Sequence, residues 1–372
     1  MDFPLAEVVY VLSAFLIGLN VGSFLNVVVG RLPLEKSILW PNSRCMSCLH
    51  PLAFFDNLPI IGWLMRRGRC RYCGSAFSSR YLWVELFTGL CFAALFYLDV
   101  IANWQQIPFL ETSHSLIRAT GFPPWQAMVY FLHHAVLFSF LLACALCDLD
   151  HKAIPLSLTT VGTIVGLVSA TCLAWPFPNS PALTAALHDP ILVNSELRPK
   201  SWSFDLRESI VLGLYPWPVW GPLPDFLVKH SWVLGLITGL AGAAAGMLLI
   251  RAVKFTFEKG LGKEALGLGD ADLLMMAGAF VGWQPVVTAF FIGAVVSLPL
   301  GVIFQLVKKE RAFPFGPGLA IGVMLTLFLW PRIGPVLQLY LFEEILVVVA
   351  IVVLGGGLFI GSIVVRVLGF GK

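Results

Sequence analysis

Charged residues are scarce in this 372-residue chain: they make up 12% of it, whereas hydrophobic residues make up 58%. A soluble protein typically devotes about a quarter of its residues to charge, because charge keeps its surface in water. The shortage therefore excludes an ordinary soluble globular protein. Apolar runs of the roughly 20 residues that cross a bilayer recur along the chain. We expect an all-α polytopic membrane protein whose partner is the lipid bilayer, and no nucleic-acid partner.

The first apolar run, Val8 to Gly30, also lacks the features of a cleavable signal peptide. It has no basic segment before it and no convincing small-residue cleavage site before its end, so we expect a retained span. Residues 273–307 carry no charge over 35 positions, too long for one helix, and 282–285 (Gly-Trp-Gln-Pro) should break this run. The eight or nine expected transmembrane helices lie at about 8–29, 81–99, 125–147, 156–175, 232–250, in the two parts of 273–307, and at about 316–331 and 345–365.

Basic residues gather in the loop at 30–80, where eight of them accompany only two acidic residues. The positive-inside rule places such a segment in the cytoplasm. Alternating the spans from this loop puts the other basic clusters on the same face. It also puts Asp148 and Asp270 there, and it makes 176–231 an external loop.

Two CxxC motifs, at 45–48 and 70–73, have 21 residues between them. The spacing is typical of a tetrahedral zinc site with Cys45, Cys48, Cys70 and Cys73 as ligands. Two disulfides are the alternative, which a reducing cytoplasm disfavours. Four thiolates leave no open position for water, so the predicted Zn²⁺ is structural and the loop at 30–80 is a small cytoplasmic zinc-knuckle loop.

Two aspartates border charge-free apolar runs. Asp148 opens the sequence DLDHKAIP, and Asp270 closes the sequence GLGD. Carboxylates at the edge of hydrocarbon are costly and usually functional. Two of them at one membrane surface can share a proton and activate a water, as in aspartyl proteases. The alternative is a set of solvated carboxylates at helix ends, with Asp270 as an N-cap.

Each of these aspartates has a second one two residues later, Asp150 and Asp272. On a helix the two members of each pair point roughly 200° apart. At most one member of each pair can therefore face a common partner.

Polar side chains also lie inside the predicted spans. Glu85 is an intramembrane acid, which marks a functional hypothesis by default, with an interfacial carboxylate as the alternative. Three polar residues, Asn20, Ser23 and Asn26, lie on one stripe of the first span and suit helix packing as well as ligand binding. His133 and His134 are adjacent, so they cannot both face one metal, and we expect them to form interhelical hydrogen bonds.

Taken together, the motifs resemble one family over nearly the whole chain: the type IV prepilin peptidases, or leader peptidase/N-methyltransferases, which are GxGD membrane aspartyl proteases. The resemblance lies in GSFLNVV at 22–28, RLP at 31–33, the two CxxC motifs, SRY at 79–81, VEL at 84–86, DLDH at 148–151, IP at 154–155, GLGD at 267–270 and PFGP at 314–317.

The resemblance implies that Asp148 and Asp270 are the catalytic pair and that Asp150 and Asp272 are not catalytic. It implies a methyltransferase-like part at 1–124 that holds the zinc loop, followed by an aspartyl peptidase domain at 125–372. S-adenosylmethionine would be the methyl donor. The candidate residues for its site are Asn26, Arg80, Tyr81 and Glu85.

The implied enzyme lies in the bacterial inner membrane with its active site facing the cytoplasm. It would cleave the short basic leader of type 4 prepilins or pseudopilins, for a type IV pilus or type II secretion, and then methylate the new N-terminus. The alternatives are a peptidase without methyl transfer, and a transporter with a zinc knuckle, whose charges should lie nearer the midplane.

Three positions depart from the family pattern. Asp272 stands where a Lys is usual, Gly30 stands where a bulkier residue is usual, and the stretch at 176–231 is longer than expected.

Overall fold

The computed structural model describes residues 5–105, 110, 113–172, 226, 230–261, 267–308 and 314–340, with short helical pieces between 348 and 363. The predicted external loop, apart from 226, 230 and 231, lies outside the described residues, as does part of the predicted span at 345–365. Regular secondary structure within the described residues is helical throughout, with two isolated β-bridges in the cysteine loop. The prediction of an all-α protein is confirmed.

The chain divides into two compact units, Met1–Cys147 and Asp148–Lys372. This division falls near the end of a helix, whereas the functional division predicted from the sequence precedes that helix, at 124/125. The predicted functional division stays a prediction.

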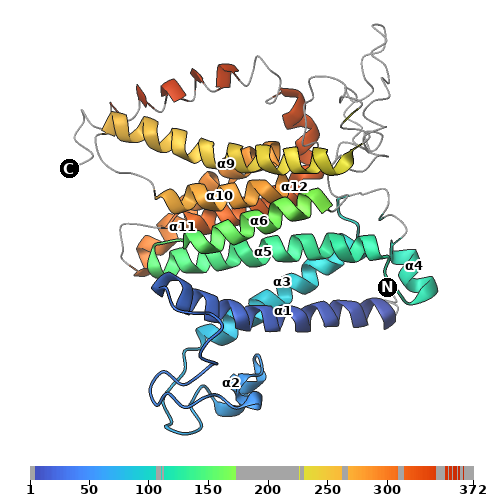
Figure 1. The fold of residues 1–372 in the computed structure, drawn as a ribbon, viewed down its shortest axis with the longest axis vertical. Helices are drawn as coiled ribbons and strands as arrows, with labels where there is room; N and C mark the ends of the chain where they lie inside the picture. The colour runs from blue at the N-terminus through green and yellow to red at the C-terminus, as the bar shows by residue number, and fades with distance from the viewer. Residues whose placement is uncertain are drawn as a thin grey trace. The chain divides into compact units, whose positions relative to one another are not determined.

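The first unit is built on two long helices joined by the cysteine loop (Figure 1). Helix α1 packs lengthwise against α3, and the short α4 contacts α1 and the turn that follows α3. The elements of this unit are α1 (Leu5–Arg31), η1 (Leu32–Leu34), η2 (Phe54–Asn57), α2 (Ile61–Arg66), α3 (Arg80–Phe96), the π-helical turn η3 (Tyr97–Ile101), α4 (Ser113–Thr120) and most of α5 (Trp125–His151).

The second unit is a helical bundle arranged around one short helix, α10 (Leu268–Val281). Helix α10 packs against α6 (Leu156–Cys172), α9 (Ser231–Leu261), α11 (Trp283–Lys308) and α12 (Gly316–Tyr340). Nearly every residue of α10 after its first turn is buried.

Small residues allow α9 and α10 to approach closely. A Cβ atom placed on Gly242 of α9 would collide with the carbonyl of Gly278 of α10, and one placed on Gly278 would collide with the carbonyl of Gly242. Helices in a membrane gain their contact from such close packing, because lipid tails are as apolar as leucine. The pair therefore fixes the position of α10 within its unit.

The predicted break in the long apolar run is confirmed at Gly282, which lies between α10 and α11 with a φ of 82°. Pro285 does not end a helix. It lies in the first turn of α11, where a proline removes no intrahelical hydrogen bond.

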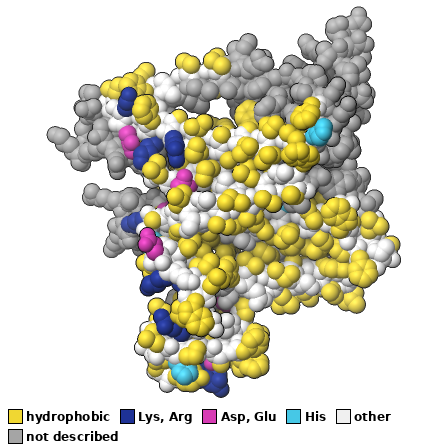
Figure 2. All heavy atoms as spheres, viewed as in Figure 1, with side chains coloured by type: hydrophobic (Ala, Val, Ile, Leu, Met, Phe, Trp, Pro, Cys, Tyr) yellow, Lys and Arg dark blue, Asp and Glu magenta, His cyan; other side chains and the backbone are white. Residues whose placement is uncertain are grey.

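Within the residues that the structure describes, five helices are long and apolar enough to cross a membrane: Leu5–Leu34, Arg80–Ile101, Trp125–His151, Trp232–Gly260 and Trp283–Val307. Shorter apolar helices occur at Leu156–Cys172, Gly316–Trp330 and Val348–Gly357. At 1.5 Å per residue, a 17-residue helix reaches only about 26 Å across a hydrocarbon core of about 30 Å. The chain is a multi-pass membrane protein, and the count of eight or nine spans stays a prediction. Hydrophobic side chains cover the flanks of the helices (Figure 2).

Candidate functional site

Asp148 lies in the last turn of α5 and is only 7% exposed. Helix α5 ends just beyond it, where Lys152 takes a left-handed conformation with a φ of 52°. Oδ2 of Asp148 accepts a hydrogen bond of 2.8 Å from the backbone N–H of Gly316, the first residue of α12. The first amides of a helix have no intrahelical partner and carry partial positive charge, so this contact favours the anionic carboxylate.

The position of Gly316 leaves no room for a side chain. A Cβ atom there would lie 2.6 Å from Oδ2 of Asp148 and 3.2 Å from its Cγ. This contact gives the PFGP motif a physical role, because the motif starts α12 beside the carboxylate.

Asp270 lies in the first turn of α10 and is 8% exposed. Burial raises the pKa of Asp270 from its ordinary 3.8 to about 7, and the negative charge of Asp148 adds to the increase. The N-cap of α10 is Gly267, and no side chain caps the helix, so the alternative of Asp270 as an N-cap is wrong. The structure brings the two carboxylates close enough for the charge of Asp148 to influence the ionisation of Asp270.

The glycine turn before Asp270 packs against the turn that follows Asp148. A Cβ atom on Gly269 would lie 3.1 Å from Cβ of Ile154, which belongs to the Ile-Pro turn between α5 and α6. Two motifs that are far apart in the sequence therefore meet at the carboxylates.

The second aspartate of each pair has a different environment. Asp150 is exposed, whereas Asp148 is buried. Asp272 is half-buried, and burial raises its pKa while the positive charge of Arg251 in α9 lowers it. The predicted divergence of each pair is confirmed.

The four cysteines of the CxxC motifs converge on one point. Their sulfur atoms all lie within 4.8 Å of one another and form a group that could hold a metal ion. The Sγ atoms of Cys45 and Cys73 lie 3.7 Å apart, and those of Cys48 and Cys70 lie 3.9 Å apart. Four thiolates at about 2.3 Å from a tetrahedral Zn²⁺ would be about 3.8 Å apart, so the donor set fits that ion. All four thiols are free, which speaks against the disulfide alternative.

The two cysteine turns repeat each other. The N–H of Leu49 donates to the carbonyl of Cys45, and the N–H of Gly74 donates to the carbonyl of Cys70. Leu49 and Gly74 share a left-handed backbone, with φ of 58° and 71°. The Ser47 and Ser75 hydroxyls, one from each turn, lie 2.8 Å apart. Each turn contributes one buried and one exposed cysteine to the cluster.

Backbone amides prepare the first thiolate. The N–H groups of Cys48 and Ser47 lower the pKa of the Cys45 thiol to about 6. For Cys73 the N–H of Ser75 acts in the same direction, but burial and the other three sulfurs outweigh it and raise its pKa to about 11. Four thiolates without a cation would repel one another, and a bound divalent metal removes this cost.

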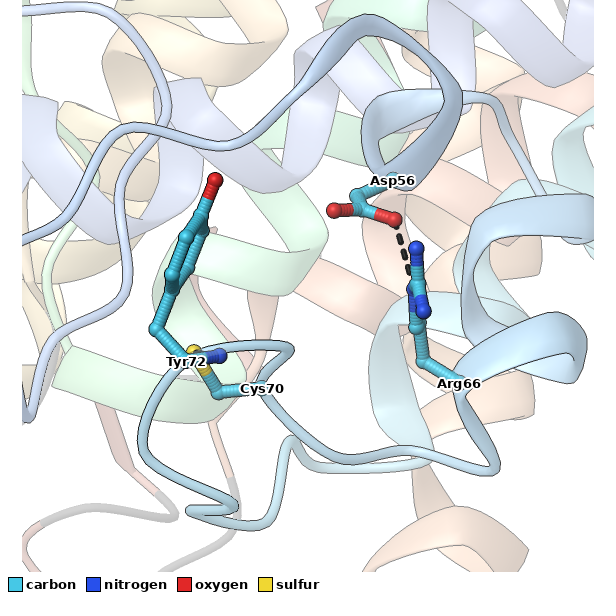
Figure 3. A network of polar contacts seen from close by, with 4 residues as sticks. All are labelled: Asp56, Arg66, Cys70 and Tyr72. Atoms are coloured by element: carbon cyan, nitrogen blue, oxygen red, sulfur yellow. Dashed lines mark hydrogen bonds and ion pairs between the residues drawn. The ribbon is translucent and has the colours of Figure 1, made fainter.

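An ion pair joins η2 to α2 within the loop that carries the cysteine turns. Nε of Arg66, the last residue of α2, donates to Oδ1 of Asp56 over 2.7 Å. Figure 3 shows this pair beside Cys70 and Tyr72, where the N–H of Tyr72 lies 3.5 Å from Sγ of Cys70.

Comparison with known proteins shows which family the chain belongs to. Residues 16–98 match the bacterial peptidase A24 N-terminal domain, and residues 223–302 match the type IV leader peptidase family. The prepilin leader peptidase/N-methyltransferase of Stutzerimonas stutzeri is 30% identical over 353 residues, which cover 88% of this chain and 92% of that protein. The chain belongs to the prepilin leader peptidase/N-methyltransferase family.

Other members of this family are equally similar. The one from Myxococcus xanthus is 31% identical over 300 residues, which cover 81% of this chain and 64% of that protein's length. The one from Pseudomonas aeruginosa is 29% identical and covers 88% of this chain and 91% of that protein. No solved structure matches the chain.

The candidate methyl-donor residues of this family member meet where α1 packs on the start of α3. Oε2 of Glu85 accepts a 2.7 Å hydrogen bond from the N–H of Ile60, and the Ser23 side chain of α1 bonds the same carboxyl group. Nδ2 of Asn26 donates to the carbonyl of Tyr81 over 3.3 Å. Glu85 is buried, whereas Tyr81 is exposed. The four residues are therefore neighbours. The hydrogen bonds of Asn26 and Glu85 to the backbone also hold the local structure together.

Sequence reasoning did not identify the buried pair of Asp99 and His134 in the first unit. Nδ1 of His134 lies 2.8 Å from Oδ2 of Asp99, and neither side chain is exposed. His134 confirms the predicted interhelical hydrogen bond, since α5 contacts the π-helical turn η3 through it. An acid near the end of one span and a histidine in the next span were the signal that pointed to this pair.

Proposed function

We propose that this family member cleaves the leader of type 4 prepilin-like proteins, prepilins or pseudopilins, and N-methylates the new N-terminus. One observation carries the peptidase assignment: Asp148 and Asp270 are buried together, and the charge of the first raises the pKa of the second. Two interacting carboxylates that hold one proton are the catalytic unit of aspartic proteases.

The contacts support a separate role for each carboxylate. The amide of Gly316 favours the ionised form of Asp148, while Asp270, with a pKa of about 7, is still partly protonated at neutral pH. Asp148 then removes a proton from water as the water oxygen attacks the scissile carbonyl, and Asp270 donates its proton to the carbonyl oxygen. When the diol collapses, the C–N bond breaks, Asp148 protonates the leaving amine and Asp270 regains its proton.

For methyl transfer, S-adenosylmethionine would supply the methyl group from a sulfonium cation. The buried carboxylate of Glu85 and the exposed ring of Tyr81 are groups that stabilise a cation, and they fit such a donor. With Asn26 and Arg80 they form the proposed donor site within residues 1–124. The peptidase site belongs to residues 125–372.

For the metal centre, Zn²⁺ would be held by Cys45, Cys48, Cys70 and Cys73. Its role is structural, because the four sulfurs complete the tetrahedron and leave no position for water. Metal binding then contributes directly to folding of the loop between α1 and α3.

For the location, we propose the bacterial inner membrane, with the cysteine loop and the two carboxylates on the cytoplasmic side. The excess of basic residues in the loop at 30–80 supports this orientation. If a thiol introduced beside Asp270 were labelled only by a reagent added from the outer side, this orientation would be refuted.

Purified protein incubated with a synthetic prepilin, with and without S-adenosylmethionine, tests both activities by the masses of the products. Cleavage without the donor, and a further 14 Da with it, are the expected results, since a methyl group replaces one hydrogen. Cleavage without the added mass would establish the peptidase alone.

Variants of the carboxylates separate the two sites. Asp148→Asn and Asp270→Asn should each abolish cleavage, because removing one member of a catalytic unit costs about as much as removing both. Exposed Asp150→Asn is the matched control and should cleave. Methylation of a pre-cleaved peptide should survive all three changes. Robust cleavage by Asp148→Asn or Asp270→Asn would end the aspartyl-protease assignment.

A further inference from the structure

The loop between α1 and α3 is fixed at its middle, at Ile60, to the membrane-spanning helix α3. The hydrogen bond from the N–H of Ile60 reaches Glu85, five residues after the start of α3 at Arg80. At 1.5 Å per residue, Glu85 lies about 7.5 Å along the helix from its start. The loop at Ile60 therefore lies beside the first turns of a spanning helix and does not extend away from them.

Large apolar side chains surround this anchor and face outward. Five of them are each more than half exposed. We name them the apolar tip: Phe54, Phe55, Ile61, Leu64 and Met65. They come from η2 and α2, on both sides of Ile60 in the sequence. Figure 2 shows hydrophobic side chains gathered beside Lys and Arg on the loop that carries α2 in Figure 1. Large apolar side chains that are exposed together on one loop mark an interaction surface.

The exposed charge of this loop is mostly positive. Five basic side chains of the loop are exposed: Lys36, Arg44, Arg67, Arg69 and Arg71. Glu35 is the one exposed acid between residues 31 and 80, a stretch that the structure describes throughout. Asp56 is already paired with Arg66. The surface therefore complements an anionic partner and repels a basic peptide such as a prepilin leader.

We propose that the apolar tip inserts into the leaflet beside α3, and that Arg67, Arg69 and Arg71 bind anionic lipid headgroups there. Apolar side chains combined with Lys and Arg are the features that hold a segment in the bilayer interface. The hydrogen bond between Ile60 and Glu85 holds the tip at the level of the membrane surface, whereas a loop without this bond would have no fixed level. This membrane contact is independent of both proposed activities.

Photocrosslinking in nanodiscs tests the insertion. The full-length protein would carry benzoylphenylalanine at Phe55, with Leu12 on the exposed flank of α1 as the lipid-facing reference and exposed Met46 in the first cysteine turn as the matched loop control. In discs of phosphatidylethanolamine and phosphatidylglycerol, we expect lipid adducts at Phe55 at a level close to Leu12 and several times that at Met46. Adducts at Phe55 no higher than at Met46, or crosslinks at Phe55 to a second protein chain in place of lipid, would overturn the proposal.

Lipid composition tests the anionic partner. In discs of phosphatidylcholine alone, the lipid adduct at Phe55 should fall several-fold, and the double variant Arg67→Gln/Arg71→Gln should show the same fall in anionic discs. A yield that is unchanged in both cases would overturn the headgroup assignment. Metal content, measured on every variant, confirms that the cysteine turns remain folded.

Discussion

Gly316 donates its backbone N–H to Oδ2 of Asp148 over 2.8 Å, a contact between residues 168 positions apart in the sequence. The donor belongs to the backbone, so no substitution at this position except proline deletes it. What a substitution adds is a Cβ atom, and that atom has no space. The orientation of the carboxylate therefore depends on the absence of a side chain.

Gly316→Ala should lower leader cleavage by about tenfold or more, because a catalytic group displaced by even 1 Å loses much of its rate. The new methyl group would lie 2.6 Å from Oδ2 of Asp148 and push the carboxylate away from the amide. Gly30→Ala is the matched control, since a Cβ atom there meets nothing within 4 Å. Initial cleavage rates with a synthetic prepilin provide the measurement. Equal rates for the two variants would contradict the role assigned to Gly316.

The raised pKa of Asp270 should make stability depend on pH. Between about pH 4 and 7 the carboxyl group of Asp270 is ionised in the unfolded chain but still protonated in the folded protein. The free energy of unfolding therefore falls as pH rises through this range, and it stops falling above about pH 7. The difference between a pKa of 3.8 and one of about 7 corresponds to a cost of about 4 kcal/mol. Asp270→Asn removes this cost, so it should raise the unfolding temperature at pH 8 and change it little at pH 4.

Thermal unfolding in detergent at the two pH values provides the measurement, with exposed Asp150→Asn as the control that should differ at neither. A stabilisation by Asp270→Asn of equal size at pH 4 and pH 8 would show that burial of Asp270 is not the cause.

The metal site should hold one Zn²⁺ per chain, because four sulfurs within 4.8 Å of one another complete a single tetrahedron. Cys45→Ser should lose the metal and loosen the loop between α1 and α3. Cys172→Ser, an exposed thiol outside the cluster, should retain the metal. Elemental analysis of the purified variants gives the stoichiometry, and hydrogen exchange reports the order of the loop. An active wild-type protein without metal would exclude the site.

The buried Asp99–His134 pair should contribute strongly to stability. Asp99→Ala leaves a buried imidazole without its partner, and removing one member of a buried pair costs about 3–5 kcal/mol. The control is Glu258→Ala, which breaks an i,i+4 pair with Lys254 at 3.5 Å and should cost about 0.5 kcal/mol or less. Unfolding temperatures of the two variants provide the comparison. Similar losses in both would mean that the buried pair adds nothing beyond a surface contact.

Local features of the sequence predicted much of what the structure contains. Hydropathy placed the helices, and the glycine at 282 marked the break, because both depend on residues close together in the chain. The helical period predicted that Asp148 and Asp150 would diverge. Cysteine spacing predicted the metal cluster, because CxxC turns fold locally.

The tertiary partners of these residues were beyond the reach of such patterns. Hydropathy states that a segment is buried and does not state against what, so the amide of Gly316 was not identified as the partner of Asp148. Asp99 was missed for the same reason. The anchor of Glu85 on Ile60 involves a backbone N–H in a loop, a donor that every non-proline residue possesses and no motif reveals.

The contact between Gly242 and Gly278 has a consequence for the tolerance of this protein to mutation. Neither residue carries a reactive group, yet a single added methyl on either must force α9 and α10 apart. Helix α10 begins with the turn that holds Asp270, so such a wedge would shift one carboxylate relative to the other. In a population of random variants selected for loss of cleavage, these two glycines should recur beside the aspartates themselves. The cleavage activity is therefore sensitive to mutations at two residues that carry no catalytic group.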